Sequence, residues 1–256
     1  NRSIQQLSLR EMNLFGGEIF QSLRPFFENN NSISTIEVAE CEFGGGSARE
    51  LSLALRSCNK SLKSFYLRHL GVGDDQLAVD IIDSLSAHPQ LQELELSDIN
   101  VGRNGCMALV GLLRGSFTDM QELDLRNAGI DDDGANALVG ALANSNFNLR
   151  RLDLASNSIT VSICQSLAAL LENLNSNVAD LYLNNNNIRD EGALILANAL
   201  ATNRKLNTLQ LHNSGITAEG WSSFSKVLCD TSSINNTFLS NHTLEYLAEE
   251  GEDNIP

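Results

Sequence analysis

The sequence predicts an α/β solenoid with a parallel sheet on its concave side and helices on its convex side. Two observations predict this fold. An apolar pattern recurs along the chain, and each period joins a segment with strand alternation to a segment with helical spacing. The first positions of the pattern are separated by 29 or 28 residues, and they are Ile4, Ile33, Leu62, Leu91, Met120, Leu149, Val178, Leu206 and Ile234.

Each period divides into a strand half and a helix half. The first half alternates apolar and polar residues, as a half-buried strand does. In the fifth period Ala135, Leu138, Val139 and Leu142 follow helical spacing. One such unit has an apolar face that only stacked neighbours can bury. Because a helix is about 10 Å wide and strands lie about 4.8 Å apart, the stack should curve with its strands inside.

Two copies carry a more specific pattern, Leu123-Asp-Leu125-Arg-Asn-Ala-Gly-Ile130 and Leu181-Tyr-Leu183-Asn-Asn-Asn-Asn-Ile188. They resemble the leucine-rich-repeat family, in particular its ribonuclease-inhibitor-like subfamily, and the resemblance extends from Ile4 to about Leu244. The family's Asn/Cys position is filled by Cys41, Asn157 and Asn186. Five repeats carry another residue at this position, so the usual side-chain bonds to the turn backbone should be lost or weakened there. These residues are Met12, Leu70, Ile99, Ala128 and Ser214.

The chain is interpreted as a single domain over 1–256, with eight full repeats and a degenerate capping repeat from about 234. In that last copy Ile234, Thr237 and Leu239 hold the pattern, and a short helix should close the stack. Trp221 stands where other repeats have Ala or Cys, so it should cover the terminal core. The start at Asn1 without Met suggests an excised or processed piece.

Composition narrows the function classes. Net charge is −15, from 17 basic and 32 acidic residues, so nucleic acid and anionic membranes should be repelled. No apolar run is long enough to span a membrane. Five cysteines without a CxxC motif predict free thiols and a cytoplasmic setting. Five N-x-S/T sequons argue against this setting, but a chain so rich in Asn and Ser contains a few by chance. The sequons are at Asn1, Asn30, Asn59, Asn235 and Asn241.

No motif predicts catalysis, a metal or a cofactor. The loop Gly44-Gly-Gly-Ser47 lacks the Lys that completes a phosphate loop, and Gly71-Val-Gly73 is no dinucleotide fingerprint. The acidic clusters at 74–75, 131–133 and 190–191 fall at expected helix starts, where carboxylates cap N–H groups. The four histidines are too dispersed to form a ligand set.

The informative residues are the polar ones of the strands, whose side chains should point to the concave face. The candidate partner-binding residues are Tyr66, Arg68, Glu93, Glu95, Glu122, Asp124, Arg126, Arg151, Asp153, Asp180 and Tyr182. They suggest an acidic groove with aromatic flanks for a basic partner. The alternative is that this face is polar only because it meets water, with Arg126 and Arg151 partly neutralising the acids.

The resemblance implies a non-enzymatic, monomeric module that binds a protein on its concave face. Two alternatives remain open. Ran-type GTPase-activating proteins share such repeats, although here the acidic tail is short, from Glu245 to Pro256. The chain could also be the recognition fragment of a larger receptor or effector.

Overall fold

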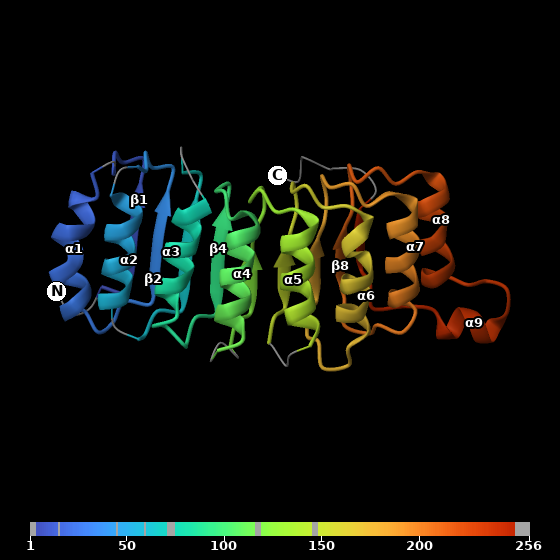
Figure 1. Ribbon diagram of the computed structural model, residues 1–256. Helices are drawn as coiled ribbons and strands as arrows, with labels where there is room; N and C mark the ends of the chain where they lie inside the picture. The colour runs from blue at the N-terminus through green and yellow to red at the C-terminus, as the bar shows by residue number, and fades with distance from the viewer. Residues whose placement is uncertain are drawn as a thin grey trace. The chain divides into compact units, whose positions relative to one another are not determined.

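A computed structural model describes residues 4–14, 16–44, 46–58, 60–70, 75–115, 119–144 and 148–248. The chain divides into two compact units, residues 1–130 and 131–256, which are described separately below. In both units parallel strands alternate with helices along the chain (Figure 1).

The described residues of the first unit form five strands and four helices. Its strands pair in chain order, all parallel, without a shift in register, so that Leu9 lies beside Val38 and Val38 beside Leu67. Each helix packs on the next one along the chain. The elements are β1 (Gln6–Arg10), α1 (Glu18–Asn29), β2 (Thr35–Ala39), α2 (Ser47–Ser57), β3 (Ser64–Arg68), α3 (Asp75–Leu85), β4 (Glu93–Ser97), α4 (Gly102–Leu113) and β5 (Glu122–Asp124).

The second unit repeats this plan, and its helices α5 to α8 lie side by side (Figure 1). Its strands again pair in parallel and in chain order. The elements are α5 (Asp132–Ala143), β6 (Arg151–Asp153), the 3₁₀ helix η1 (Val161–Ile163), α6 (Cys164–Glu172), β7 (Asp180–Tyr182), α7 (Arg189–Leu200), β8 (Thr208–Gln210), α8 (Ala218–Leu228), α9 (Ile234–Leu239) and β9 (Tyr246–Ala248).

The repeat pattern predicted the strands and the core correctly. Each of the strands β1 to β8 begins two residues after a first pattern position. The apolar residues of the predicted helix, Ala135, Leu138, Val139 and Leu142, are all buried in α5. The α/β solenoid fold class is therefore confirmed.

For the ninth copy of the pattern, the expectation of a short helix is confirmed by α9, but the strand residues of that copy were placed wrongly. Residues from Ile234 to Leu239 form α9, so Asn236 and Phe238 do not belong to a strand. The strand that pairs with β8 is β9, in which Tyr246 lies opposite Thr208, 246 − 208 = 38 residues along the chain. A ten-residue extension relative to a 28-residue repeat therefore precedes the last strand.

Asn241 explains where the ninth repeat resumes. Its amide nitrogen donates to the backbone oxygens of Leu200 (2.7 Å) and Asn203 (3.0 Å). Its side-chain oxygen accepts from the backbone nitrogen of Leu244, as that of Asn203 accepts from Leu206. Leu244 thus takes the place that Leu206 has in the repeat before, and the extra residues leave the stack as α9 (Figure 1).

The Asn/Cys position behaves as the family resemblance implies. The side-chain amide of Asn186 donates to the carbonyls of Leu154 (2.9 Å) and Leu183 (3.0 Å). Its oxygen accepts from the backbone nitrogen of Asn157 at 3.2 Å. Ser214, a departure from the pattern, still donates to the Leu183 carbonyl at 3.1 Å. These bonds tie each turn to the preceding repeat.

The expectation that the acidic clusters cap their own helices is confirmed for Asp131, whereas Asp132 and Asp190 bind the following repeat instead. Asp131 accepts from the backbone nitrogen of Gly134 at the start of α5. Asp132 accepts from the backbone nitrogen (2.7 Å) and hydroxyl (2.6 Å) of Thr160, the residue that caps η1. Asp190 binds Thr217 in the same way, at 2.7 and 2.8 Å. These carboxylates therefore join successive repeats.

Three other sequence predictions have mixed outcomes. Ser47, in the glycine-rich loop, donates to the Gly44 carbonyl at 2.6 Å, which is a structural role. Gly45 and the stretch 71–74 lie outside the described residues. Trp221 is only half-buried; its ring lies 5.6 Å from that of Phe224, so it covers the terminal core in part.

Candidate functional site

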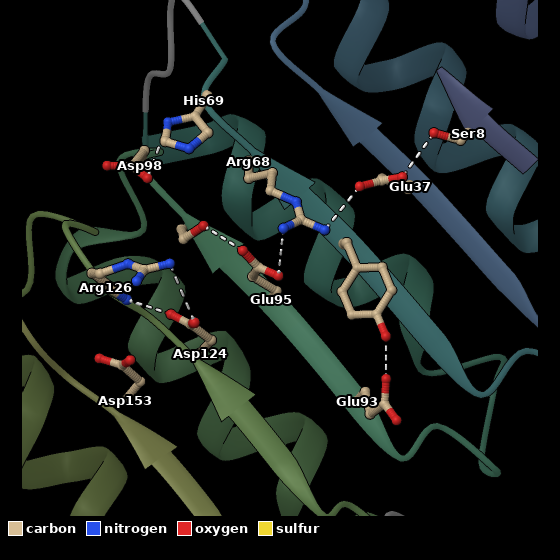
Figure 2. Close-up of polar contacts among 12 residues, drawn as sticks. Ser8, Glu37, Arg68, His69, Glu93, Glu95, Asp98, Asp124, Arg126 and Asp153 are labelled. Carbon is tan, nitrogen blue, oxygen red and sulfur yellow. Dashed lines mark hydrogen bonds and ion pairs between the residues drawn. The ribbon is translucent and has the colours of Figure 1, made fainter. Parts of the chain in front are cut away.

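The candidate site is the strand face, meaning the sheet surface formed by the alternate strand residues that do not enter the core. In the first unit these residues come from β1 to β5, and Figure 2 shows their polar contacts. The strands are in register, so equivalent residues of neighbouring repeats lie next to each other. Acids and arginines on this face are therefore close enough to interact.

Glu37 is an enclosed carboxylate of the first unit's strand face, with 5% of its side chain exposed. It accepts hydrogen bonds from Ser8 Oγ (2.7 Å), Arg10 Nη2 (2.5 Å) and Arg68 Nη2 (2.8 Å). Burial raises its pKa, but the bonds from Arg10 and Ser8 and the charges of both arginines outweigh burial and hold the pKa below its usual value. Glu37 is therefore an ionised anchor.

Arg68 links three strands. Besides Glu37 on β2, it lies 3.5 Å from a carboxylate oxygen of Glu95 on β4. Its guanidinium also stands 5.4 Å from the centre of the Tyr66 ring, a cation–π distance. Glu95 in turn accepts from the buried hydroxyl of Ser97 at 2.8 Å. The charges of Glu37, Arg68 and Glu95 thus alternate in sign across the sheet (Figure 2), and Arg10 extends the series beyond Glu37.

Tyr66 joins a different pair of acids. Its hydroxyl donates to Glu93, and Glu93 lies in register with Glu122 of β5. Burial, this hydrogen bond and the charges of Glu93 and Glu122 raise the pKa of Tyr66 to about 12. Among the described residues, neither glutamate forms an ion pair. The negative charges of Glu93 and Glu122 are therefore not balanced by any described cation.

Asp124 closes the first unit's strand face at the end of β5. One of its oxygens accepts from the backbone nitrogen of Arg126 at 3.0 Å, and the other lies 3.7 Å from that arginine's guanidinium. The backbone bond makes Asp124 partly a turn residue. Its charge is balanced within the chain.

The second unit holds the remaining four predicted residues. Asp153 is 3% exposed and accepts from the backbone nitrogen of Ala155 at 3.0 Å. Arg151 lies 3.6 Å from Asp153, with its guanidinium 4.6 Å from the centre of the Tyr182 ring. Asp180 of β7 lies in register with Arg151 of β6.

Solvent exposure differs between the arginines and two of the acids in the acidic groove that the sequence suggests. Side-chain exposure is 55% for Arg10 and 45% for Arg126, but 13% for Glu95 and 15% for Asp124. Arginine side chains are longer, so their guanidinium groups stand above the shorter acids that they bind. Glu95 and Asp124 are therefore balanced by arginines, in contrast to Glu93 and Glu122.

Sequence reasoning missed Arg10 and Glu37 as members of this network. Both are in the strand-face rows, but they lie outside the repeats where acids are densest. The missed signal was register: an Arg and a Glu in adjacent repeats, two positions apart within the strand, lie within ion-pair reach.

A polar row borders the strand face just beyond the strands. In the first unit its members have left-handed backbone, with φ near 50° at Glu11, Glu40, His69, Asp98 and Asn127. Asp98 lies 3.1 Å from His69 Nδ1 and accepts from the Asn127 amide at 2.8 Å. The side chains thus pair between repeats and make this border rigid.

The burial of cysteines and of sequon asparagines limits which of them can react or carry a glycan. Cys41, Cys58, Cys106 and Cys164 are buried free thiols, and Cys229 is exposed. Burial and nearby acids raise the pKa of Cys164 to about 12, so this thiol is unreactive. Two sequon asparagines, Asn30 and Asn241, are buried and donate to backbone carbonyls, which leaves no room for a glycan.

Within the described ranges, no three His, Cys, Asp or Glu side chains gather as metal ligands would. The same part of the chain contains no helix with the length and apolarity needed to cross a membrane.

Comparison with known proteins supports the repeat assignment. Residues 118–139, 145–168 and 174–197 match the family described as Leucine Rich repeat, so these segments are leucine-rich repeats. No curated protein matches the chain in sequence. The ribonuclease-inhibitor-like subfamily was expected from the period, and no match tests it.

Several solved structures are similar to this chain, and the fold likeness rests on the first two below. An internalin from Listeria monocytogenes is 15% identical, with a TM-score of 0.51; the match covers 88% of this chain and 57% of that one. The structure of the Rad7 and Elc1 complex in yeast is 14% identical, with a TM-score of 0.50. That match covers 95% of this chain and 62% of that one. Leiomodin-1 actin-binding site 2 is 21% identical over 58% of this chain and 79% of that one, with a TM-score of 0.47. The chain thus spans about three fifths of the internalin and Rad7 structures, and the likeness concerns fold alone.

Proposed function

We propose that the chain is a non-enzymatic interaction module that binds a protein partner on its strand face. Stacked leucine-rich repeats offer a rigid, extended surface for this purpose. Leucine-rich-repeat proteins act in general as binding scaffolds, and nothing in the described site resembles a catalytic arrangement. We propose a cytoplasmic setting from the free thiols, and a monomeric state is a separate expectation.

The observation that carries this proposal is the Tyr66–Glu93–Glu122 corner. It presents two in-register carboxylates that form no ion pair with any described residue, next to an aromatic ring that suits a binding hot spot. A partner with Lys or Arg at this point would relieve the repulsion between Glu93 and Glu122. We therefore propose a basic partner, received at this corner rather than along the whole row from Glu93 to Tyr182.

Partner capture tests the proposal. The protein and the double variant Glu93→Gln/Glu122→Gln are used to capture proteins from a native lysate at rising salt. Loss of a close charge pair should weaken capture of basic proteins by about tenfold or more. The matched control is Glu18→Gln/Glu28→Gln, which removes the same charge from exposed positions of α1. Equal capture by both variants would contradict the proposal.

A further inference from the structure

Polar side chains on the strand face of the second unit are used differently from those of the first unit. Over β7 to β9 this face carries six residues, which we call the amide patch: Asp180, Tyr182, Asn184, Thr208, Gln210 and Tyr246. Four of their side chains form no hydrogen bond or ion pair with a described residue, namely those of Asp180, Asn184, Thr208 and Gln210. In the first unit, by contrast, Glu37, Arg68 and Glu95 bind one another. The polar groups of the patch are therefore available to a ligand.

Tyr246 reaches this face because the repeat resumes after α9. It lies opposite Thr208 in the pairing of β9 with β8, and Leu247 lies opposite the buried Leu209. Since side chains alternate along a strand, Tyr246 points to the same side of the sheet as Thr208. The residue is 40% exposed. Tyr182 and Tyr246 thus stand two strands, or about 10 Å, apart, with β8 between them.

The surroundings hold the amide patch in place. The guanidinium of Arg151 lies 4.6 Å from the centre of the Tyr182 ring and covers one face of it. Just beyond the strands, Asn185 Nδ2 donates to Ser156 Oγ, and Asn213 Nδ2 donates to Asn185 Oδ1, both at 3.0 Å. A ligand therefore meets a surface that is already ordered, which lowers the entropy cost of binding.

The chemistry of the patch suits an extended peptide. A side-chain amide such as that of Gln210 or Asn184 has two N–H donors and a carbonyl acceptor, so it can pair with both the N–H and the C=O of a peptide group. The tyrosines beside these amides offer apolar contact area together with a hydroxyl. Asp180 carries the one formal charge among the six residues, and the neighbouring Arg151 and Asp153 have opposite charges 3.6 Å apart. The local charge therefore favours a basic side chain.

We propose that the amide patch binds an extended peptide segment that carries a basic side chain. Gln210 and Asn184 pair with the peptide backbone, the basic side chain pairs with Asp180, and an apolar side chain packs on Tyr246. The inference rests on the proposed role of the strand face in binding a protein, and it names the kind of segment that this face receives in the second unit. A neutral glycan could bind the same amides but would leave Asp180 without a cation, so the charge favours the peptide.

Three labelled ligands test the proposal by fluorescence anisotropy with the whole protein. They are a twelve-residue peptide that repeats Ser-Lys-Thr-Val, an acidic counterpart that repeats Ser-Glu-Thr-Val, and cellohexaose. The basic peptide should bind saturably, and Asp180→Asn and Tyr246→Ala should each weaken its binding by about tenfold. Gln210→Leu keeps the approximate size of the side chain but removes its amide, and it should weaken binding by about fivefold.

Two matched controls make the result specific. Asp83→Asn makes the same charge change at an exposed position of α3, and Gln165→Leu makes the same amide change at an exposed position of α6. Both should change affinity by less than about twofold, and circular dichroism should show unchanged folding for all variants. The proposal is overturned by no saturable binding, by equal binding of the acidic peptide, or by tighter binding of cellohexaose than of the basic peptide.

The same measurement separates the amide patch from the Tyr66–Glu93–Glu122 corner. Binding of the basic peptide should persist in Glu93→Gln/Glu122→Gln, because this variant leaves the second unit unchanged. Binding that is lost in this variant would place the peptide at the corner, which overturns the inference and leaves the proposed function in place. If peptide binding persists and the same variant also captures basic proteins as well as the wild type does, the inference stands and the proposed corner fails.

Discussion

Replacing Glu37 by Gln should destabilise the first unit, although the change is nearly isosteric. The variant leaves Arg10 and Arg68 without the carboxylate that binds both. Breaking a fully buried pair costs about 3–5 kcal/mol. Arg68 is 30% exposed and can recover part of its hydration, so we expect a loss of about 2 kcal/mol. For a unit of this size, that loss lowers the melting temperature by roughly 4–8 °C.

The loss should depend on pH with a definite sign. The folded-state pKa of Glu37 lies below its ordinary value of 4.5, so the folded protein binds fewer protons. Its contribution is therefore present above pH 4.5 and disappears as the pH falls through the folded-state pKa. Urea unfolding of both proteins between pH 7 and 3 measures this difference. Glu122→Gln, at an exposed position without an ion pair, is the control and should cost less than about 0.5 kcal/mol.

A stability difference that is constant with pH, or a Glu37→Gln variant as stable as the wild type, would refute this reasoning. A constant difference would mean that shape rather than charge holds Glu37. Equal stability would mean that desolvation of the carboxylate cancels its ion pairs.

Three further predictions concern other groups. Asp132→Asn should cost about 1 kcal/mol in urea unfolding, because its carboxylate holds Thr160; since its pKa is lowered, this cost should vanish in acid. Tyr66 should resist ionisation until about pH 12 in an ultraviolet titration, and Tyr66→Phe should remove that late step; an ionisation near pH 10 would contradict its bond to Glu93. A thiol reagent should modify Cys229 alone in the native protein and the four buried cysteines only after denaturation; a second fast thiol would be inconsistent with the packing.

The regular repeats could be predicted because their period is a local property. A residue such as Leu94 or Leu152 is apolar at a fixed place in every repeat, and that place determines which face it takes. The turn residue Asn186 could be predicted for the same reason, since only a side-chain amide both donates to and accepts from the turn backbone.

The strand of the last repeat was not predicted correctly, because the apolar pattern there is weak and fits two registers. Ile234 and Leu239 continued the spacing, whereas Asn241 and Leu244 carried the actual repeat ten residues later. Both readings have comparable apolar spacing. Only the hydrogen bonds from Asn241 to the preceding repeat decide between them.

The sequence by itself determined the solenoid fold, the strand positions and which polar residues share a face. The charge state of that face depended on tertiary structure. A list of acids and arginines cannot tell whether Glu37 repels its neighbours or joins Arg10 to Arg68, because the answer depends on distances of a few ångströms across strands 29 residues apart. Coulomb energies and desolvation both change steeply over such distances, so side-chain length and burial decided which carboxylates are occupied and which, at Glu93 and Glu122, remain available.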